Sequence, residues 1–164
     1  MTDRVSRIGS LLERGCALIA GATLAAALAS MAGQVVFRYA IGSSLVWSEE
    51  FARYALIWSA MFGAAAGYQR GAHAAVTVLT DQLPGRLGTT AHRFSHLVVV
   101  AFTAFVAWQG ALLTGRNFAR DQLSPALQIP IAWVYLAIPV GALLIGVAAL
   151  LATWRGLPPS QIEI

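Results

Sequence analysis

Hydrophobic positions along the chain gather into four long uncharged runs separated by charged residues. Three of the runs are long enough to cross a bilayer, because a membrane-spanning helix needs about 20 apolar residues. These three cover residues 15–37, 94–115 and 122–154. In the last of them Pro130 is typical of a helix's first turn, so this helix is expected at 131–154.

The second run is shorter, and its length is informative. Arg53 and Arg70 enclose sixteen uncharged residues, which form about 24 Å of helix against a hydrocarbon core of about 30 Å. The helix must therefore begin earlier, and we expect it at 46–69. Its first two turns then hold Glu49 and Glu50 close to the lipid headgroups, a depth at which charged side chains are rare and usually paired.

The pattern predicts an all-α integral membrane protein, a single domain over residues 1–164 with four transmembrane helices. They are expected at about 15–38, 46–69, 94–115 and 131–154. Seven arginines lie in the terminal and central polar segments and four on the opposite side, which favours both termini in the cytoplasm, N-in/C-in. The inner connection at 70–93 is either a short amphipathic surface helix or a polar loop.

Composition supports this class and excludes others. The chain is 58% hydrophobic and 11% charged, whereas a soluble domain carries about a quarter charged residues. A soluble enzyme, a nucleic-acid-binding domain and a disordered tail are therefore excluded. The net charge of +4 comes from arginines placed between apolar runs, which indicates membrane orientation. The single cysteine, Cys16, excludes an internal disulfide.

Small residues mark the faces on which helices are expected to pack. In the first helix they recur every fourth position, a spacing that lets a neighbouring backbone approach closely. The second helix carries small residues near its inner end and an aromatic stripe from Trp47 to Phe62, which faces either lipid or a partner. The predicted packing positions are Gly21, Ala25, Ala29, Gly33, Gly63 and Gly67.

The acids at the start of the second helix form a charged cluster. Glu49 and Glu50 precede Arg53 by four and three residues, which are favourable spacings for ion pairs on a helix. Ser48 or Ser44 is expected to cap the helix, and Arg38 is a further candidate partner. Because buried ion pairs are seldom net stabilising, such a cluster is better explained by fixing helix register or meeting a partner protein.

Catalytic and metal chemistry find little support in the sequence. His92 and His96 are four residues apart but lack the glutamate of the zinc-protease motif. A haem anchor needs axial histidines from two helices, and His96 alone is expected inside the bilayer. No catalytic residue, metal site or cofactor is predicted. Few ionisable groups lie mid-helix, which favours a partner-dependent subunit over an autonomous transporter.

An ordered set of motif residues resembles a known family. It begins with Arg38-Tyr39, Ser44, Trp47, Glu49-Glu50 and Arg53, continues with Trp58, Gly63, Arg70, Gly71, His73 and Asp81 to Pro84, and ends with Ile129-Pro130, Trp133, Tyr135, Pro139 and Gly141. Over roughly residues 15–155 this set resembles the small permease subunit, of the DctQ type, of tripartite ATP-independent periplasmic (TRAP) transporters. The chain departs from the family pattern at Val46 and at residues 74–77.

The resemblance implies a multi-pass subunit of the bacterial inner membrane, in contact with membrane lipids and not with nucleic acid. It would scaffold a large permease, expected as a separate chain, and help dock a periplasmic substrate-binding protein for sodium-driven uptake of a small organic anion. The implied partner interface comprises Arg38, Tyr39, Trp47, Glu49, Glu50, Arg53 and Trp58, and the implied inner-loop motif comprises Arg70, Gly71, His73, Asp81 and Pro84.

Two other interpretations remain at this stage. One is a haem- or quinone-linked membrane anchor subunit of a respiratory enzyme, and the other is a four-helix assembly factor without a transport role.

Overall fold

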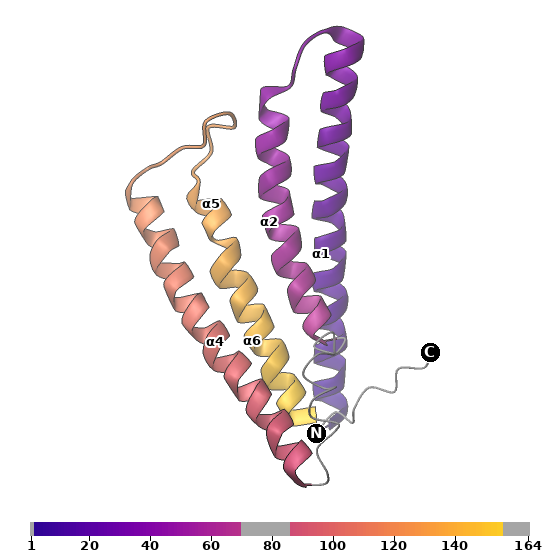
Figure 1. The fold of residues 1–164 in the computed structure, drawn as a ribbon, viewed down its shortest axis with the longest axis vertical. Helices are drawn as coiled ribbons and strands as arrows, with labels where there is room; N and C mark the ends of the chain where they lie inside the picture. The colour runs from indigo at the N-terminus through magenta and orange to yellow at the C-terminus, as the bar shows by residue number, and fades with distance from the viewer. Residues whose placement is uncertain (1, 70–85, 156–164) are drawn as a thin grey trace.

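The computed structural model of the chain describes residues 2–69 and 86–155, which form helices joined by short non-helical segments, without any strand (Figure 1). An isolated antiparallel bridge joins Leu123 to Pro130. The elements are α1 (Thr2–Val36), the π-helical turn η1 (Phe37–Ile41), α2 (Val46–Gln69), α4 (Arg86–Ala119), the short α5 (Ala132–Tyr135) and α6 (Ala137–Arg155).

The helices form two antiparallel hairpins that meet along α2 and α6 (Figure 1). In the first hairpin α1 packs along α2, and in the second α4 packs along α6. Gly42 turns the chain between α1 and α2 with a φ of 73°, a conformation that glycine adopts without strain. This turn and the segment 120–131 lie at the same end of the bundle, which we call the turn end.

Small side chains fill the interior, and large apolar side chains cover the outside. Leu18, Phe102 and Trp108 are 74%, 65% and 68% exposed. A water-soluble protein rarely exposes such a continuous apolar surface, whereas a helix bundle in lipid packs through small residues. Apart from Cys16, Tyr68 and Val134, the buried hydrophobic residues are Ala27, Ala52, Ala55, Ala65, Ala66, Ala107, Ala132, Ala137, Ala142, Ala148 and Ala149.

Three helical segments among the described residues are long and apolar enough to span a membrane. They are Arg7–Ile41, Phe94–Ala119 and Ala132–Leu151. The all-helical membrane class is therefore confirmed with three candidate spans. Helix α2 falls outside this set because its first two turns carry the acids and Arg53.

The helices extend beyond the expected apolar limits. Helix α1 begins at Thr2 and α4 begins at Arg86. The polar residues before each apolar run are helical too, and a prediction from hydrophobicity alone does not include them. The fourth helical segment is interrupted at Leu136. Pro139 explains this interruption, since proline has no N–H to donate to the carbonyl four residues earlier.

The face of α1 that packs against α2 lies beside the predicted row of small residues. Cys16 packs with Ala65 and Ala66, and the Ser59 hydroxyl donates to the Ala20 carbonyl at 2.9 Å. A strict four-residue spacing drifts by about 40° per step around a helix, so the predicted row turns away from α2. Gly21, Ala25 and Ala29 are exposed, Gly33 and Gly67 are half-buried, and a Cβ on Gly63 would lie 3.9 Å from Ala20 Cβ.

Among the described glycines, those of α4 and α6 lie closest to atoms of neighbouring helices, and they were not among the predicted packing positions. A Cβ on Gly141 would lie 2.6 Å from Met61 Cβ in α2, and one on Gly146 would lie 2.9 Å from Thr103 Oγ1 in α4. A Cβ on Gly110 would lie 2.9 Å from Pro139 Cδ. The Gly141 position therefore sets how closely the two hairpins approach.

We expect Gly141→Ala to destabilise the bundle because the new methyl group overlaps Met61 Cβ, which cannot move without its backbone. Overpacking of this kind costs about 1–3 kcal/mol. Cys16 is only 4% exposed, so a fluorogenic maleimide that labels it on unfolding reports the melting temperature, which should fall by several degrees.

Gly115→Ala is the matched control for this melt, because nothing lies within 4 Å of a Cβ at that position. Its melting temperature should equal or exceed that of the unsubstituted chain. Equal melting temperatures for the two variants would contradict the assigned packing of Gly141.

Candidate functional site

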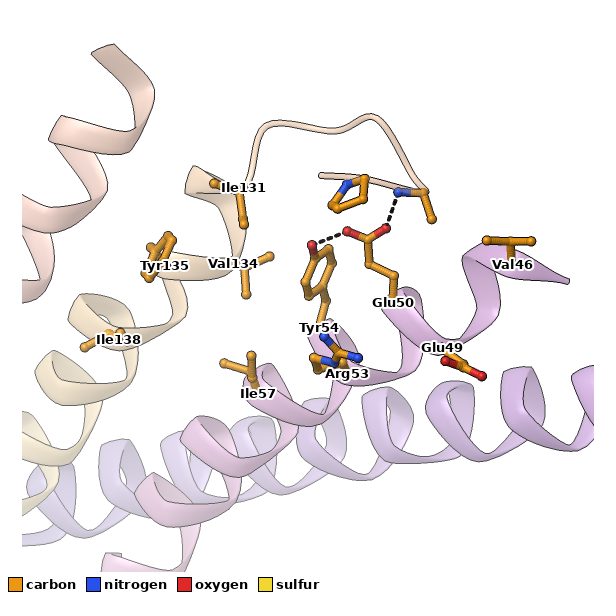
Figure 2. Close-up of a pocket in the computed structure, with 12 residues that line it drawn as sticks. Val46, Glu49, Glu50, Arg53, Tyr54, Ile57, Ile131, Val134, Tyr135 and Ile138 are labelled. Carbon is orange, nitrogen blue, oxygen red and sulfur yellow. Dashed lines mark hydrogen bonds between the residues drawn. The ribbon is translucent and has the colours of Figure 1, made fainter. Parts of the chain in front are cut away.

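The two acids at the start of α2 point toward different parts of the molecule (Figure 2). Adjacent residues on a helix project about 100° apart. Glu49 therefore faces α1, where its Oε1 accepts a hydrogen bond from Gln34 Nε2 at 2.9 Å. Glu50 faces the segment between α4 and α5. The adjacent pair thus links α2 to both of its neighbours at the turn end.

Glu50 is held by three donors and is only 8% exposed. Its Oε2 accepts hydrogen bonds from the backbone N–H groups of Ala126 at 2.7 Å and Leu127 at 3.0 Å. Its Oε1 accepts a hydrogen bond from the Tyr54 hydroxyl, one helical turn further along α2 (Figure 2). Hydrogen bonds to an ionised carboxylate are stronger than those between neutral groups, so Glu50 fastens this segment to α2.

The segment between α4 and α5 is folded so that its backbone N–H groups reach Glu50. Ser124 N donates to Ile129 O at 2.8 Å, and Gln128 Nε2 donates to Ser124 O at 3.1 Å and to Pro125 O at 3.0 Å. Gln128 has a φ of 54°, a left-handed conformation that is uncommon outside glycine. Two successive N–H groups pointing at one anion form a small anion-binding concavity.

Two buried polar atoms near the acids have no hydrogen-bond partner among the described residues. They are the Ser124 Oγ, in a residue with 0% exposure, and the Gln34 Oε1. Each belongs to a residue that also supports an acid: Gln34 binds Glu49 directly, and Ser124 anchors the segment that binds Glu50. Gln34 therefore keeps an unused acceptor beside Glu49, whereas the Ser124 hydroxyl lies beside the Glu50 carboxylate.

The expected ion pairs and helix cap are replaced by other contacts. In the described part of the chain the acids bond to an amide, a phenol and backbone N–H groups, and Arg53 is exposed without an ion pair or hydrogen bond. Neutral donors satisfy a carboxylate without the desolvation of a guanidinium. The Ser48 hydroxyl donates to Leu45 O at 2.6 Å, so it does not act as the cap expected of it.

The other predicted interface residues lie on η1 and along α2. Arg38 and Tyr39 belong to the exposed turn η1, and Tyr39 is 82% exposed. Trp47 is exposed and lies edge-on to Phe51, while Trp58 is half-buried and stacks on Phe62 with 5.7 Å between ring centroids. The inner-loop motif, Arg70, Gly71, His73, Asp81 and Pro84, lies outside the described residues.

His96 has a structural partner on a neighbouring helix. Its Nδ1 lies 2.6 Å from the Tyr68 hydroxyl, a hydrogen bond that joins α4 to α2. Within residues 2–69 and 86–155 no group of three or more His, Cys, Asp or Glu side chains is placed to hold a metal ion.

A cavity of about 560 Å³ opens between the first half of α2 and the α5–α6 segment (Figure 2). Its walls are mostly apolar, with Ile57 from α2 and Val134 and Ile138 from the second hairpin. Arg53 and the two acids border it at the turn end. Tyr54, Ala126 and Leu127 hold the Glu50 carboxylate, and the sequence pattern predicted none of the three as its partners, although Tyr54 lies in the aromatic stripe from Trp47 to Phe62. The four-residue spacing of Glu50 and Tyr54 on a helix could have predicted their contact, whereas no sequence pattern indicates the backbone N–H donors.

Comparison with known proteins identifies related chains. Residues 27–158 match the sequence model of the family described as tripartite ATP-independent periplasmic transporters, DctQ component. A C4-dicarboxylate TRAP transporter small permease protein, DctQ, of Rhodobacter capsulatus is 33% identical over 118 residues, which cover 70% of this chain and 50% of that protein. The chain thus spans about half the length of that relative.

Two further relatives differ in length. A putative TRAP transporter small permease protein of Haemophilus influenzae is 30% identical over 119 residues, covering 73% of this chain and 71% of that protein. An isethionate TRAP transporter permease protein, DctMQ, of Oleidesulfovibrio alaskensis is 30% identical over 114 residues, covering 65% of this chain but 18% of that protein. All three relatives are transporter permease proteins rather than enzymes.

We expect Glu50→Ala to release the 124–128 segment, because two backbone N–H groups lose their carboxylate acceptor. Hydrogen bonds to charged groups contribute about 1.5–3 kcal/mol, so amide exchange at Ala126 and Leu127 should accelerate about tenfold or more. Hydrogen–deuterium exchange of the full chain, followed by mass spectrometry of peptides covering this segment, measures the effect.

Glu49→Ala is the control for the exchange measurement, since it removes a neighbouring acid that bonds only toward α1. Exchange in the 124–128 segment should stay unchanged in this variant. Equal acceleration in both variants would show that general loosening of α2, rather than loss of the Glu50 contacts, is responsible.

Proposed function

Because the chain belongs to the DctQ family of TRAP transporter components, we propose that it scaffolds a large permease subunit in the bacterial inner membrane. It also helps to dock a periplasmic substrate-binding protein. The complex imports a small organic anion, such as a carboxylate or a sugar acid, driven by a cation gradient that is expected to be sodium. Two of the three named relatives are C4-dicarboxylate and isethionate permease proteins, which supports the anion class.

The observation that supports the scaffold role is that the carboxylates of the site accept hydrogen bonds from other groups of the same chain. The Glu50 carboxylate is occupied by Tyr54 and two backbone N–H groups, and Glu49 is occupied by Gln34. Such groups hold the helices in register, and the buried Glu50 carboxylate in particular is already bound within the chain. A rigid frame for a partner fits this arrangement better than an independent translocation path.

We further propose that residues 1–164 form one membrane domain in which α2 is a fourth span and both termini are cytoplasmic. Helix α2 contains 24 residues, about 36 Å at 1.5 Å per residue, which is enough to cross the hydrocarbon core. It packs antiparallel to α1, and Glu50 joins it to the segment that follows α4. The turn end is then the periplasmic end.

The periplasmic partner surface is proposed to comprise the exposed members of the predicted interface. Arg38, Tyr39 and Trp47 lie on η1 and at the start of α2 with their side chains exposed. Aromatic residues and arginine are enriched in protein interfaces. Arg53 and Trp58 lie further along α2 and continue this surface. The exposed row of small residues around Gly21 offers a second face that a partner helix can approach closely. Glu50 contributes indirectly, because it fixes the neighbouring segment.

The topology is tested by labelling engineered thiols in a Cys16→Ala background with a membrane-impermeant maleimide. In spheroplasts, Ser43→Cys and Gln122→Cys should both react, because a four-span protein places both positions in the periplasm. Ser10→Cys should react only after the inner membrane is lysed. If α2 did not cross the membrane, positions 43 and 122 would be labelled from opposite sides.

The scaffold role is tested by charge reversal at an exposed arginine. Arg38→Glu should reduce co-purification of the large permease by about tenfold, since like-charge contacts at an interface cost a few kcal/mol, and uptake should fall in parallel. Arg120→Glu reverses another exposed arginine at the turn end and should leave both unchanged. Unaltered co-purification and uptake in Arg38→Glu would exclude this interface.

A further inference from the structure

A glutamine on the exposed side of α4 lies in the central part of a candidate membrane span. The midpoint of the Phe94–Ala119 span falls between positions 106 and 107, so Gln109 is about 4 Å from it at 1.5 Å per residue. Its side chain is exposed and makes no hydrogen bond with the described residues. Half of a hydrocarbon core measures about 15 Å, and glutamine is shorter than the lysine and arginine side chains that extend to the headgroups. The Gln109 amide of the isolated chain therefore faces hydrocarbon.

The other amide and hydroxyl side chains between residues 100 and 119 of α4 satisfy their donors within the helix. Thr103, Thr114 and Asn117 each donate to the backbone carbonyl four residues earlier, over 2.8 to 2.9 Å. A glutamine amide carries two N–H donors and a carbonyl acceptor, and leaving such groups unpaired in an apolar medium is costly. Gln109 is the exception in this part of α4, and its amide requires a partner from outside the chain.

Gln109 belongs to a row of exposed side chains with the spacing of a helix-packing surface. Phe102, Phe105, Gln109 and Leu112 follow one another at intervals of three, four and three residues, and all four are exposed. This is the a/d spacing by which one helix packs along another, and a polar side chain at a single such position fixes the register of the pair. We call these four residues the Gln109 face. It belongs to α4, whereas the partner surface proposed above belongs to η1 and α2.

We infer that the Gln109 face receives one transmembrane helix of the large permease, and that a side chain of this helix exchanges hydrogen bonds with the Gln109 amide. Lipid cannot fill this role, because the hydrocarbon core offers no hydrogen-bonding groups, and the backbone of a membrane helix is already satisfied. The partner helix must therefore present a polar side chain, usually serine, threonine, asparagine, glutamine or histidine between membrane helices. The assignment of this helix to the large permease rests on the proposed function.

The charge on α4 disfavours a second copy of the chain as the occupant. Arg116 continues the same spacing seven residues beyond Gln109, about 10 Å nearer the turn end, and is exposed. A symmetric pair that matched Gln109 with Gln109 would place the two Arg116 guanidinium groups opposite each other, and like charges across an interface are unfavourable. A different polypeptide avoids this repulsion, and an acceptor beside Arg116 would add a second polar contact.

The contact is tested by placing p-benzoylphenylalanine at position 109 or 111 of the full chain, co-expressed with a tagged large permease. Ala111 is the matched control, since it is exposed at nearly the same depth but projects about 160° away from Gln109 around α4. On irradiation of the membranes, position 109 should crosslink strongly to the large permease and position 111 only weakly. Equal crosslinking from both positions, or a product with the mass of two copies of this chain, would overturn the inference.

Substitution measures the contribution of the amide. Gln109→Leu removes the donors and the acceptor while keeping a side chain of similar size, so co-purification of the large permease should fall about fivefold, equivalent to about 1 kcal/mol. Gln109→Asn retains an amide and should restore part of the loss, whereas Ala111→Leu should co-purify as the unsubstituted chain does. The melting temperature of the chain alone should not fall in Gln109→Leu, because the amide bonds to none of the described residues. A fall of several degrees would assign the amide to the bundle itself and contradict the inference.

The unsubstituted chain separates failure of this inference from failure of the proposed function. If it retains no large permease, the proposed function fails and this inference fails with it. If it retains the permease and Gln109→Leu retains it equally well, the proposed function stands and the Gln109 face is excluded as the contact.

Discussion

The turn end depends on one constraint: a buried carboxylate must be surrounded by hydrogen-bond donors. Glu50 meets this constraint through Tyr54 and the backbone N–H groups of Ala126 and Leu127. Since two of these donors belong to the segment after α4, the hydrogen bonds that satisfy the carboxylate also join the second hairpin to the first. The same contacts determine the shape of the proposed partner surface beside them.

Close packing of the helices complements this polar fastening. Lipid is as apolar as leucine, so burying leucine between membrane helices yields no hydrophobic gain, and association depends on packing and interhelical hydrogen bonds. Alanines therefore fill the interfaces, and the glycines of α4 and α6 allow the shortest approaches. Polar links are distributed along the bundle, from Glu50 at one end to the Tyr68–His96 hydrogen bond at the other.

The sequence was sufficient to predict the helical class and the start of α2, because both follow from hydrophobic run lengths. It was insufficient to predict the partners of the acids. Helical spacing placed Arg53 near Glu49 and Glu50, yet backbone N–H groups more than 70 positions away bind Glu50. Every residue except proline carries such a donor, so no side-chain pattern marks it. The face of α1 that packs against α2 also lies about one residue from the predicted row of small residues, because a four-residue spacing drifts around the helix.

The arrangement also explains why α2 lacks an apolar stretch as long as those of the other three long helices. It lies between α1 and α6 and contacts both, so much of its surface faces protein rather than lipid. A helix in that position can carry two acids, provided that each projects toward a neighbour that offers donors. Glu49 and Glu50 do this because adjacent positions diverge by about 100°, so one acid reaches α1 and the other the second hairpin. The polar start of α2 thus follows from its position between two neighbours, and the two adjacent acids fix that position because each bonds to a different neighbour.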